Sequence, residues 1–263
     1  MNVIGIDIGG TKICGVVYNP SRFRGAEADG KKVVDELTIV TPKNLYEFER
    51  NLIKLADFLA AKGKVLGVGI GMAGLIDDKR GTAVYSPNIK FIKNLNVVKL
   101  FQLNGYKNVK IDNDANCFTR AEMLLGQGKK LQNFLALTLG TGIGGGIVIN
   151  RKIYRGQNNS GAELGHMVSA GLFLEKSFAR ARDNRSNKDL GSVLGQAFAG
   201  LINIFAPQAI ILGGGVATDK SRHFLPLAIK EMKKFQFSRQ LKPKILISKL
   251  KNAGALGAAL LVK

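Results

Sequence analysis

A glycine-dense turn between two apolar runs is the most concentrated chemical signal in the chain. Residues 135–149 read L-A-L-T-L-G-T-G-I-G-G-G-I-V-I, which predicts strand, tight loop and strand. Glycine lacks a Cβ, so a bulky group can approach the main chain, and successive N–H groups in such a turn bind anions, most often phosphate. Gly140, Thr141 and Gly142 form the rim of this predicted loop. A glycine-rich hairpin without a ligand is the alternative for the stretch taken alone.

The same glycines also match a dinucleotide-binding pattern. Gly140, Gly142 and Gly145 fit G-x-G-x-x-G, but that motif must open a helix. Here the apolar run at 147–149 continues toward residues 151–154, a pattern typical of a second strand and its hairpin. The context therefore excludes a Rossmann site.

A second hairpin of similar design lies near the start of the chain. Apolar β-forming runs at 3–8 and 13–18 flank the sequence G-G-T-K at 9–12, and Asp7 stands near the end of the first run. Two such hairpins suggest duplicated halves that close on a shared ligand. Asp, Gly and Thr also favour ordinary turns, and a solvated Lys12 is the simpler interpretation of this segment alone.

Acidic and amide residues mark a corner in the middle of the chain. Asp112, Asn113 and Asp114 follow a short β-forming run at 109–111 and precede a predicted helix that ends near Leu125. Asp and Asn before a helix are common N-caps, which is the simpler interpretation. The functional alternative is that one carboxylate at this strand-to-helix corner faces a cleft as a general base.

A Glu-x-x-His pair follows the central hairpin. Glu163 and His166 lie on one face if the segment turns. A metal site there lacks further support, because His223 is the only other histidine and no cysteine follows Cys117. The alternative is a surface turn with an incidental histidine.

The remaining segments alternate between strand and helix patterns. Apolar residues at helical spacing over 44–61, followed by Gly63, predict a helix. Further helices are expected at 97–103, 172–181, 190–205, 220–235 and 253–262. Strands are expected at 33–40, 65–70, 209–212 and 245–247, with a polar loop at 20–32 and a basic break at 182–188. The order predicts an α/β protein, in which the glycines at 213–215 offer a third stretch of bare backbone.

The totals set limits on the class of protein. The 263 residues suffice for two modest domains or one large one. The 39 Lys and Arg outnumber the 19 Asp and Glu, giving a formal charge of +20 that favours anionic ligands. These basic residues are spread along the chain without a recognition motif, so no specific nucleic-acid partner is expected. Two cysteines, no signal peptide and no membrane-length apolar run predict a cytoplasmic protein without a membrane partner.

Five motifs in this order resemble the ROK family of sugar kinases and sugar-responsive repressors. They are D-I-G-G-T-K at 7–12, D-N-D-A-N at 112–116, L-G-T-G-I-G-G-G at 139–146, E-L-G-H-M at 163–167 and L-G-G-G-V at 212–216. The resemblance covers nearly the whole chain. It implies an α/β, two-domain, actin/hexokinase-like (ribonuclease H-like) fold with a central nucleotide and sugar cleft. The implied domains are a small one at 1–112, on which the last helix (253–263) packs back, and a larger one at 113–252.

The resemblance also implies roles for individual residues. Asp7 would organise Mg²⁺ through water, and Asp114 would be the catalytic base. The implied nucleotide contacts are Asp7, Gly9, Gly10, Thr11 and Lys12 in a first phosphate loop, Gly140, Thr141 and Gly142 in a second, and Gly213, Gly214 and Gly215 near adenosine. The implied sugar contacts are Gly74, Asn113, Asp114, Glu163, His166 and Glu175.

The chain departs from the family pattern after His166. Family members usually carry three cysteines there that bind a structural zinc together with that histidine, whereas residues 167–173 contain none. We therefore expect no zinc, and another group must orient His166. Ala73 also replaces a common proline. No helix-turn-helix segment precedes Met1, so we expect the kinase branch rather than the repressor branch.

The implied activity is phosphorylation of a hexose hydroxyl by ATP and Mg²⁺. Glucose is the first candidate, and an N-acetylhexosamine or fructose is the alternative. A non-catalytic sugar sensor of the same fold is the rival from another class. The resemblance also suggests a homodimer.

Overall fold

The computed structural model describes residues 1–20, 33–169 and 171–262, so the polar loop expected at 20–32 lies outside the described residues except for Pro20. The chain forms two compact units. Unit 1 comprises Met1–Gly126, Arg155–Gly161 and Leu250–Lys263. Unit 2 comprises Gln127–Tyr154 and Ala162–Lys249.

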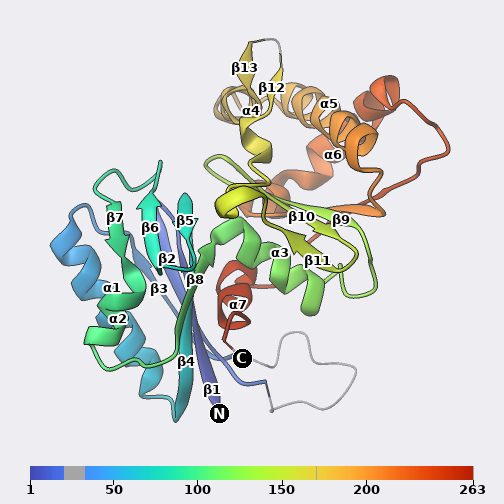
Figure 1. Ribbon diagram of the computed structural model, residues 1–263. Coiled ribbons are helices and arrows are strands. Elements are labelled where there is room, and N and C mark those ends of the chain that lie inside the picture. The colour runs from blue at the N-terminus through green and yellow to red at the C-terminus, as the bar shows by residue number, and fades with distance from the viewer. Residues whose placement is uncertain (21–32, 170, 263) are drawn as a thin grey trace. The chain divides into compact units, whose positions relative to one another are not determined.

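Unit 1 is built on a five-stranded mixed sheet in the order β3-β2-β1-β4-β8 (Figure 1). The strands are β1 (Asn2–Ile8), β2 (Lys12–Tyr18), β3 (Val33–Val40), β4 (Val65–Met72) and β8 (Val109–Asn113). The first three are antiparallel neighbours, while β4 runs parallel to both β1 and β8. The N-terminal hairpin predicted from the sequence is therefore confirmed.

Helices α1 (Leu45–Ala60) and α2 (Val97–Leu103) cover one face of this sheet (Figure 1). Asn44 caps α1 by accepting a hydrogen bond from the Glu47 amide. The helical spacing seen in the sequence is the buried face, and its side chains join the isoleucines of β1 in one core: Phe48, Leu52, Leu55, Ala56 and Leu59 with Ile4, Ile6 and Ile8.

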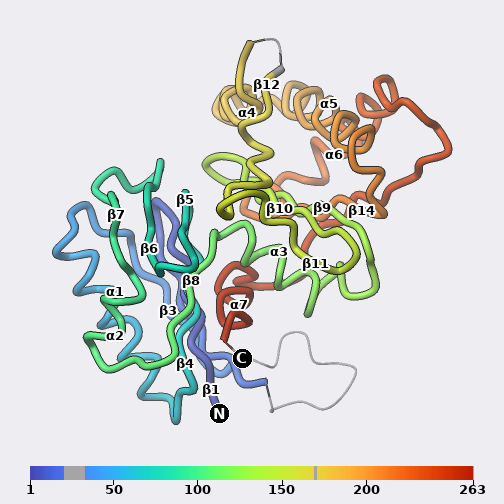
Figure 2. Tube along the Cα trace, in the orientation of Figure 1, coloured from blue at the N-terminus to red at the C-terminus, as the bar shows by residue number. Residues whose placement is uncertain are grey.

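Helices α3 (Asp114–Leu124) and α7 (Ala253–Ala259) lie on the other face, as both ribbon and tube show (Figures 1 and 2). Side chains of a strand alternate between faces, so Gly5 faces α7 while Ile4 and Ile6 face α1. A Cβ placed on Gly5 would lie only 2.0 Å from the Ala255 carbonyl oxygen. The glycine therefore lets α7 pack directly on the strand backbone.

Unit 1 also contains a small antiparallel sheet that the sequence analysis did not predict. Its strands are β5 (Leu75–Asp77), β6 (Thr82–Tyr85) and β7 (Lys93–Asn96), in that order. Strands of three or four residues are too short to show an alternating pattern, which explains the omission.

Unit 2 contains a second five-stranded sheet in the order β11-β10-β9-β14-β15. The strands are β9 (Phe134–Leu139), β10 (Ile143–Ile149), β11 (Lys152–Tyr154), β14 (Ala209–Gly213) and β15 (Lys244–Ile247). Ile143 pairs with Leu139 and Val148 with Phe134, which confirms the predicted central hairpin. Strand β11 pairs with β10, so no helix follows the glycines and the exclusion of a Rossmann motif holds.

Helices α4 (Leu174–Asp183), α5 (Asn187–Phe205) and α6 (Gly215–Phe235) cover one face of this sheet (Figure 1). Phe178, Phe198 and Phe224, one from each helix, are fully buried in a core with Leu135 and Leu137 of β9. This core gives the strand ends of unit 2 a rigid base.

Several predicted boundaries in unit 2 were wrong by a few residues. Helix α4 begins after Leu172–Phe173 (β13), because these residues pair with Val168–Ser169 (β12). Helix α6 begins at Gly215 rather than 220. Helix α5 begins at Asn187, since Ser186 caps it by accepting from the Asp189 amide. In unit 1, the closing helix α7 ends at Ala259 rather than 262.

The expected domain boundary after residue 112 stays a prediction, while the compact units divide after Gly126. Helix α3 belongs to unit 1 because it packs tightly against α7. A Cβ placed on Gly257 would lie 1.7 Å from the Cys117 carbonyl oxygen. None of the helices formed by the described residues is long and apolar enough to cross a membrane.

Candidate active site

The predicted site residues of unit 1 gather at the carboxyl ends of β1, β4 and β8. Asp7 pairs in register with Gly71, and Gly71 with Asp112. A Cβ placed on Gly71 would lie 3.1 Å from Cys117 Sγ and 3.6 Å from Asp114 Cα. The bare backbone of β4 therefore lets α3 begin close to the sheet, and this brings Asp114 toward Asp7.

Asp7 and Asp114 interact electrostatically at this edge. Loss of hydration around the partly buried Asp7, followed by the negative charge of Asp114, raises the pKa of Asp7 from 3.8 to about 7, although Lys12 opposes the shift. The first turn of α7 packs against the Asp7 carboxylate, since a Cβ on Gly254 would lie 2.3 Å from Asp7 Oδ2. A carboxylate destabilised by a second one is stabilised by a cation.

This donor set fits Mg²⁺. The ion is usually held by one or two carboxylates, several waters and substrate phosphates rather than by an all-protein cage. The described residues contain no cluster of three or more His, Cys, Asp or Glu side chains that could hold a metal. The assignment of Mg²⁺ to Asp7 stays a prediction.

The turn between β1 and β2 is fixed by backbone and side-chain hydrogen bonds. The Gly9 amide donates to the Lys12 carbonyl (3.0 Å), and Thr41 Oγ1 donates to the Gly9 carbonyl (2.7 Å). Gly10 lies against Asn88, because a Cβ there would be 2.6 Å from Asn88 Cβ. Thr11 and Lys12 remain exposed. The predicted first phosphate loop is thus a braced turn with two polar side chains at its surface.

Asn113 has the capping role that its position before a helix predicts. Its Oδ1 accepts from the amides of Ala115 (2.9 Å) and Asn116 (3.3 Å). Its Nδ2 donates to the Gly74 carbonyl at 3.0 Å. Gly74 has a φ of +120°, and a Cβ there would lie 2.1 Å from the Tyr85 carbonyl oxygen, so only glycine fits. Gly74, Asn113 and Asp114 are therefore held together.

In unit 2, the predicted second phosphate loop is closed by a hydrogen bond from the Gly140 amide to the Gly142 carbonyl (3.0 Å). Arg182 of α4 donates through Nη1 to the Gly140 carbonyl (2.8 Å) and also to the Thr141 carbonyl. Arg182 lies in the basic break predicted from the sequence at 182–188, where no contact with this loop was expected. The Arg182 guanidinium thus stabilises the loop at 140–142 by binding its carbonyl groups.

The triple glycine after β14 lies beside the same loop. Gly213 pairs with Thr138 of β9, so the two loops leave neighbouring parallel strands. Gly214 has a φ of +84°, and a Cβ there would lie 2.5 Å from the Leu139 carbonyl oxygen. Gly215 then begins α6. The structure therefore brings together the two glycine segments assigned to ATP in unit 2.

Glu163, His166 and Glu175 form a cluster in unit 2. His166 Nδ1 lies 3.4 Å from Glu163 Oε2, and His166 Nε2 lies 3.7 Å from Glu175 Oε1. The exposed fractions of the side chains are 56% for Glu163, 49% for His166 and 32% for Glu175. Glu175 also borders the phosphate loop, since a Cβ on Gly142 would lie 2.8 Å from its Oε2. The polar side chains of Glu163, His166 and Glu175 therefore lie close together.

His166 is oriented by carboxylates and an aromatic ring rather than by the cysteines of the family pattern. Its ring packs against that of Phe173 in an edge-to-face arrangement, with 5.3 Å between ring centroids. The Phe173 ring also contacts the Lys176 ammonium at 5.4 Å. The absence of zinc stays a prediction, and these neighbours are the groups that hold the histidine.

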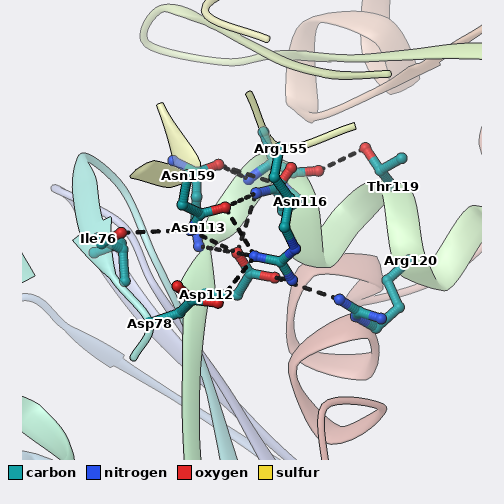
Figure 3. Close-up of polar contacts among 10 residues, drawn as sticks. Ile76, Asp78, Asp112, Asn113, Asn116, Thr119, Arg120, Arg155 and Asn159 are labelled. Atoms are coloured by element: carbon teal, nitrogen blue, oxygen red, sulfur yellow. Dashed lines mark hydrogen bonds and ion pairs between the residues drawn. The ribbon is translucent and has the colours of Figure 1, made fainter. Parts of the chain in front are cut away.

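A further network, around Asp112, was not anticipated from the sequence (Figure 3). Arg155 and Asn159 bond to its carboxylate from a segment 43 and 47 residues further along the chain. The only signal in the sequence was the acidic residue of D-N-D-A-N that had received no role. Residues this distant in sequence give no local pattern that pairs them.

The ROK family matches residues 3–184 and 174–263, so the chain belongs to the ROK family. It is 27% identical to a glucokinase of Thermotoga maritima over 100% of this chain and 98% of that protein. It is 34% identical to an N-acetyl-D-glucosamine kinase of Haemophilus influenzae over 62% of this chain and 51% of that one.

A solved structure is similar along its whole length. The chain matches a ROK family glucokinase from Streptomyces griseus, in complex with glucose and AMPPNP, with a TM-score of 0.83, 26% identity, and coverage of 100% of this chain and 99% of that one. The predicted α/β fold of the actin/hexokinase-like class is confirmed. The chain is accordingly a ROK sugar kinase, a phosphotransferase with an alcohol group as acceptor.

Proposed function

We propose that the chain transfers a phosphoryl group from ATP to a hydroxyl of a hexose, with glucose as the first candidate. The observation that carries the proposal is the interaction of Asp7 and Asp114 at the carboxyl ends of neighbouring strands. One carboxylate of such a pair, Asp7, can interact with a cation, and the other, Asp114, can accept a proton. Phosphoryl transfer to an alcohol needs both.

The glycine loops supply positions for the nucleotide. Backbone N–H groups of the turns at 9–12 and 140–142 suit phosphate oxygens, with Thr11, Lys12 and Thr141 as polar neighbours. Gly213, Gly214 and Gly215 are assigned to the adenosine side. Asp7 would hold Mg²⁺ through water, and a bound Mg²⁺ supplies neutralisation of the charge on the β- and γ-phosphate oxygens.

Asp114 is assigned as the general base that accepts the proton of the sugar hydroxyl. A positioned base contributes about 10²–10⁴-fold to rate. The sugar hydroxyls would be bound by Gly74, Asn113, Glu163, His166 and Glu175. Carboxylates accept from hydroxyl groups, while the Asn113 amide and the imidazole can donate. This set of donors and acceptors suits a ligand with several adjacent hydroxyl groups.

The identity of the sugar rests on relatives. The names glucokinase and N-acetyl-D-glucosamine kinase among them support glucose first, with N-acetylglucosamine, N-acetylmannosamine and fructose as alternatives. A non-catalytic sugar sensor is the second candidate, and the missing cysteine motif after His166 favours it. A coupled assay of ADP release with ATP and this panel of four sugars decides between them. Release that no sugar stimulates would favour the sensor.

The role of Asp114 is tested by Asp114→Asn, which keeps the shape of the side chain and removes the base. We expect phosphorylation to fall by about 10²–10⁴-fold while sugar binding, measured by calorimetry, changes little. Asp189→Asn is the matched control, because Asp189 also lies in the first turn of a helix, α5, and is exposed. Turnover by Asp114→Asn at the wild-type rate would exclude the assignment.

A further inference from the structure

Asp112 is a fully buried carboxylate surrounded by donors. Its Oδ1 accepts from the Asn113 amide (2.9 Å) and from Asn116 Nδ2 (3.0 Å). Arg155 binds both of its oxygens, with Nη2 at 2.6 Å from Oδ2 and Nη1 at 3.1 Å from Oδ1 (Figure 3). Such a bidentate pair fixes direction as well as distance. The buried carboxylate therefore ties the start of α3 to the segment that carries Arg155.

Asn159 completes the network. Its Oδ1 accepts from Arg155 Nη1 (2.8 Å), and its Nδ2 lies 3.4 Å from Asp112 Oδ1 and 3.4 Å from the Ile76 carbonyl oxygen. The residue adopts a φ of +59°, which asparagine tolerates better than most residues. Asn159 therefore has a left-handed backbone conformation at the position from which its side chain contacts the Asp112 carboxylate.

The segment Arg155–Gly161 belongs to unit 1, although the chain on both sides of it belongs to unit 2. Its loop is closed by a hydrogen bond from the Gly161 amide to the Arg155 carbonyl (2.8 Å). It is held in unit 1 by polar bonds of Arg155 to Asp112 and Asp78, and of Asn159 to Asp112 and the Ile76 carbonyl. Replacing a buried ion pair by apolar side chains is often neutral or stabilising, so stability alone is a weak explanation for this network.

Resting on the proposed function, we propose that Arg155 and Asn159 are positioning residues that set the geometry of the sugar site. The Asp112 clamp, meaning Asp112, Asn116, Arg120, Arg155 and Asn159, fixes a carboxylate whose Oδ1 accepts from the backbone N–H of Asn113. Asp114 is the next residue. The clamp thus holds the corner of unit 1 that carries Asn113 and Asp114, two residues assigned to the sugar, whereas none of its members lies in the glycine loops assigned to ATP.

This position predicts a selective kinetic effect. A displacement of about 1 Å in a reacting group can cost on the order of 10²-fold in rate. For Arg155→Met we expect kcat/KM for the sugar to fall by about 10²-fold and the sugar KM to rise by about 10-fold, with the KM for ATP within about 2-fold of wild type. The kcat/KM of Arg155→Lys for the sugar should lie between those of the wild type and Arg155→Met, because an ammonium cannot form the two parallel bonds of a guanidinium.

Asn159 offers a matched pair of variants. Asn158 is exposed and has a φ of +52°, so Asn158→Ala introduces the same backbone cost as Asn159→Ala without removing a bond to Asp112. We expect the sugar KM to rise for Asn159→Ala and to stay near wild type for Asn158→Ala. Arg151→Met is the control for Arg155→Met, because Arg151 is exposed and donates to the Lys129 carbonyl instead.

Hydrogen exchange supplies a readout that does not depend on activity. In Arg155→Met the backbone amides of 113–117 should exchange faster than in wild type and in Arg151→Met. Unchanged exchange there, or equal changes in the KM values for sugar and ATP, would overturn the clamp even if the wild type is an active sugar kinase. A wild type without sugar-stimulated ADP release would instead overturn the proposed function, and exchange would still decide whether the clamp holds this corner.

Discussion

At the scale of single residues, the two acidic groups of unit 1 differ in what surrounds them. Asp112 is enclosed by guanidinium and amide donors, while Asp7 faces a second carboxylate with Lys12 as its compensating charge. Donors on each oxygen satisfy the hydrogen-bonding capacity of a buried carboxylate. The charged form of Asp7, in contrast, is stabilised by an added cation. Asp112 therefore suits a structural role, whereas Asp7 suits a role that depends on a bound ligand.

The raised pKa of Asp7 has a consequence for stability. Its value of about 7 in the folded chain, against 3.8 for the unfolded one, means that the folded state binds the proton more tightly between these two pH values. The free energy of unfolding therefore decreases as pH rises from about 4 to about 7, by at most about 4 kcal/mol. Asp7→Asn should remove this decrease, as measured by urea unfolding at pH 5 and pH 8 without Mg²⁺ or nucleotide.

Asp35→Asn is the control for this pH dependence. A hydrogen bond from Lys62 lowers the pKa of Asp35 below its ordinary value of 3.8, so this carboxyl titrates below the window. The slope between pH 5 and pH 8 should be the same for Asp35→Asn as for wild type. Parallel slopes for Asp7→Asn and wild type would contradict the assignment of the shift to Asp7.

At the scale of elements, long strands and helices were predictable, whereas the contacts between them were not. The hairpins β1–β2 and β9–β10 follow from apolar runs on both sides of glycines, and α1 from its apolar spacing. Strands β5 to β7, β12 and β13 have two to four residues and form through partners that no local pattern reveals. For the same reason Asn113 was recognisable as a cap, while the contact of Arg182 with a loop 42 residues away was not.

The contact of α4 with the phosphate loop yields a prediction for Arg182→Met. Hydrogen bonds to charged groups contribute about 1.5–3 kcal/mol, so losing the brace should raise the KM for ATP by about 10-fold or more and change the sugar KM little. Arg180→Met is the matched control, because Arg180 lies in the same last turn of α4 and is exposed. Steady-state kinetics, with ATP and the sugar varied in turn, measures the KM for each substrate. An unchanged KM for ATP would show that the loop keeps its shape without the guanidinium.

At the scale of the whole molecule, the path of the chain is less regular than its sequence of elements suggests. Unit 1 takes three separate stretches of the chain and unit 2 takes two. The return of the last helix to unit 1 follows from close packing of glycine and alanine, as at Gly5 and Ala255. The segment Arg155–Gly161 has no apolar periodicity and is held by polar bonds to Asp112, Asp78 and the Ile76 carbonyl, so only the folded chain reveals its place.

The excess of basic residues also acts at this scale. A formal charge of +20 attracts any polyanion, and such attraction weakens steeply with salt because it depends on counterion release. We expect binding of random double-stranded DNA to be measurable by fluorescence anisotropy near 50 mM salt and to weaken by about 10³-fold or more at 200 mM. Two unrelated DNA sequences should bind equally. Binding that survives 200 mM salt and prefers one sequence would instead indicate a dedicated nucleic-acid surface, because base contacts, unlike phosphate contacts, carry sequence information.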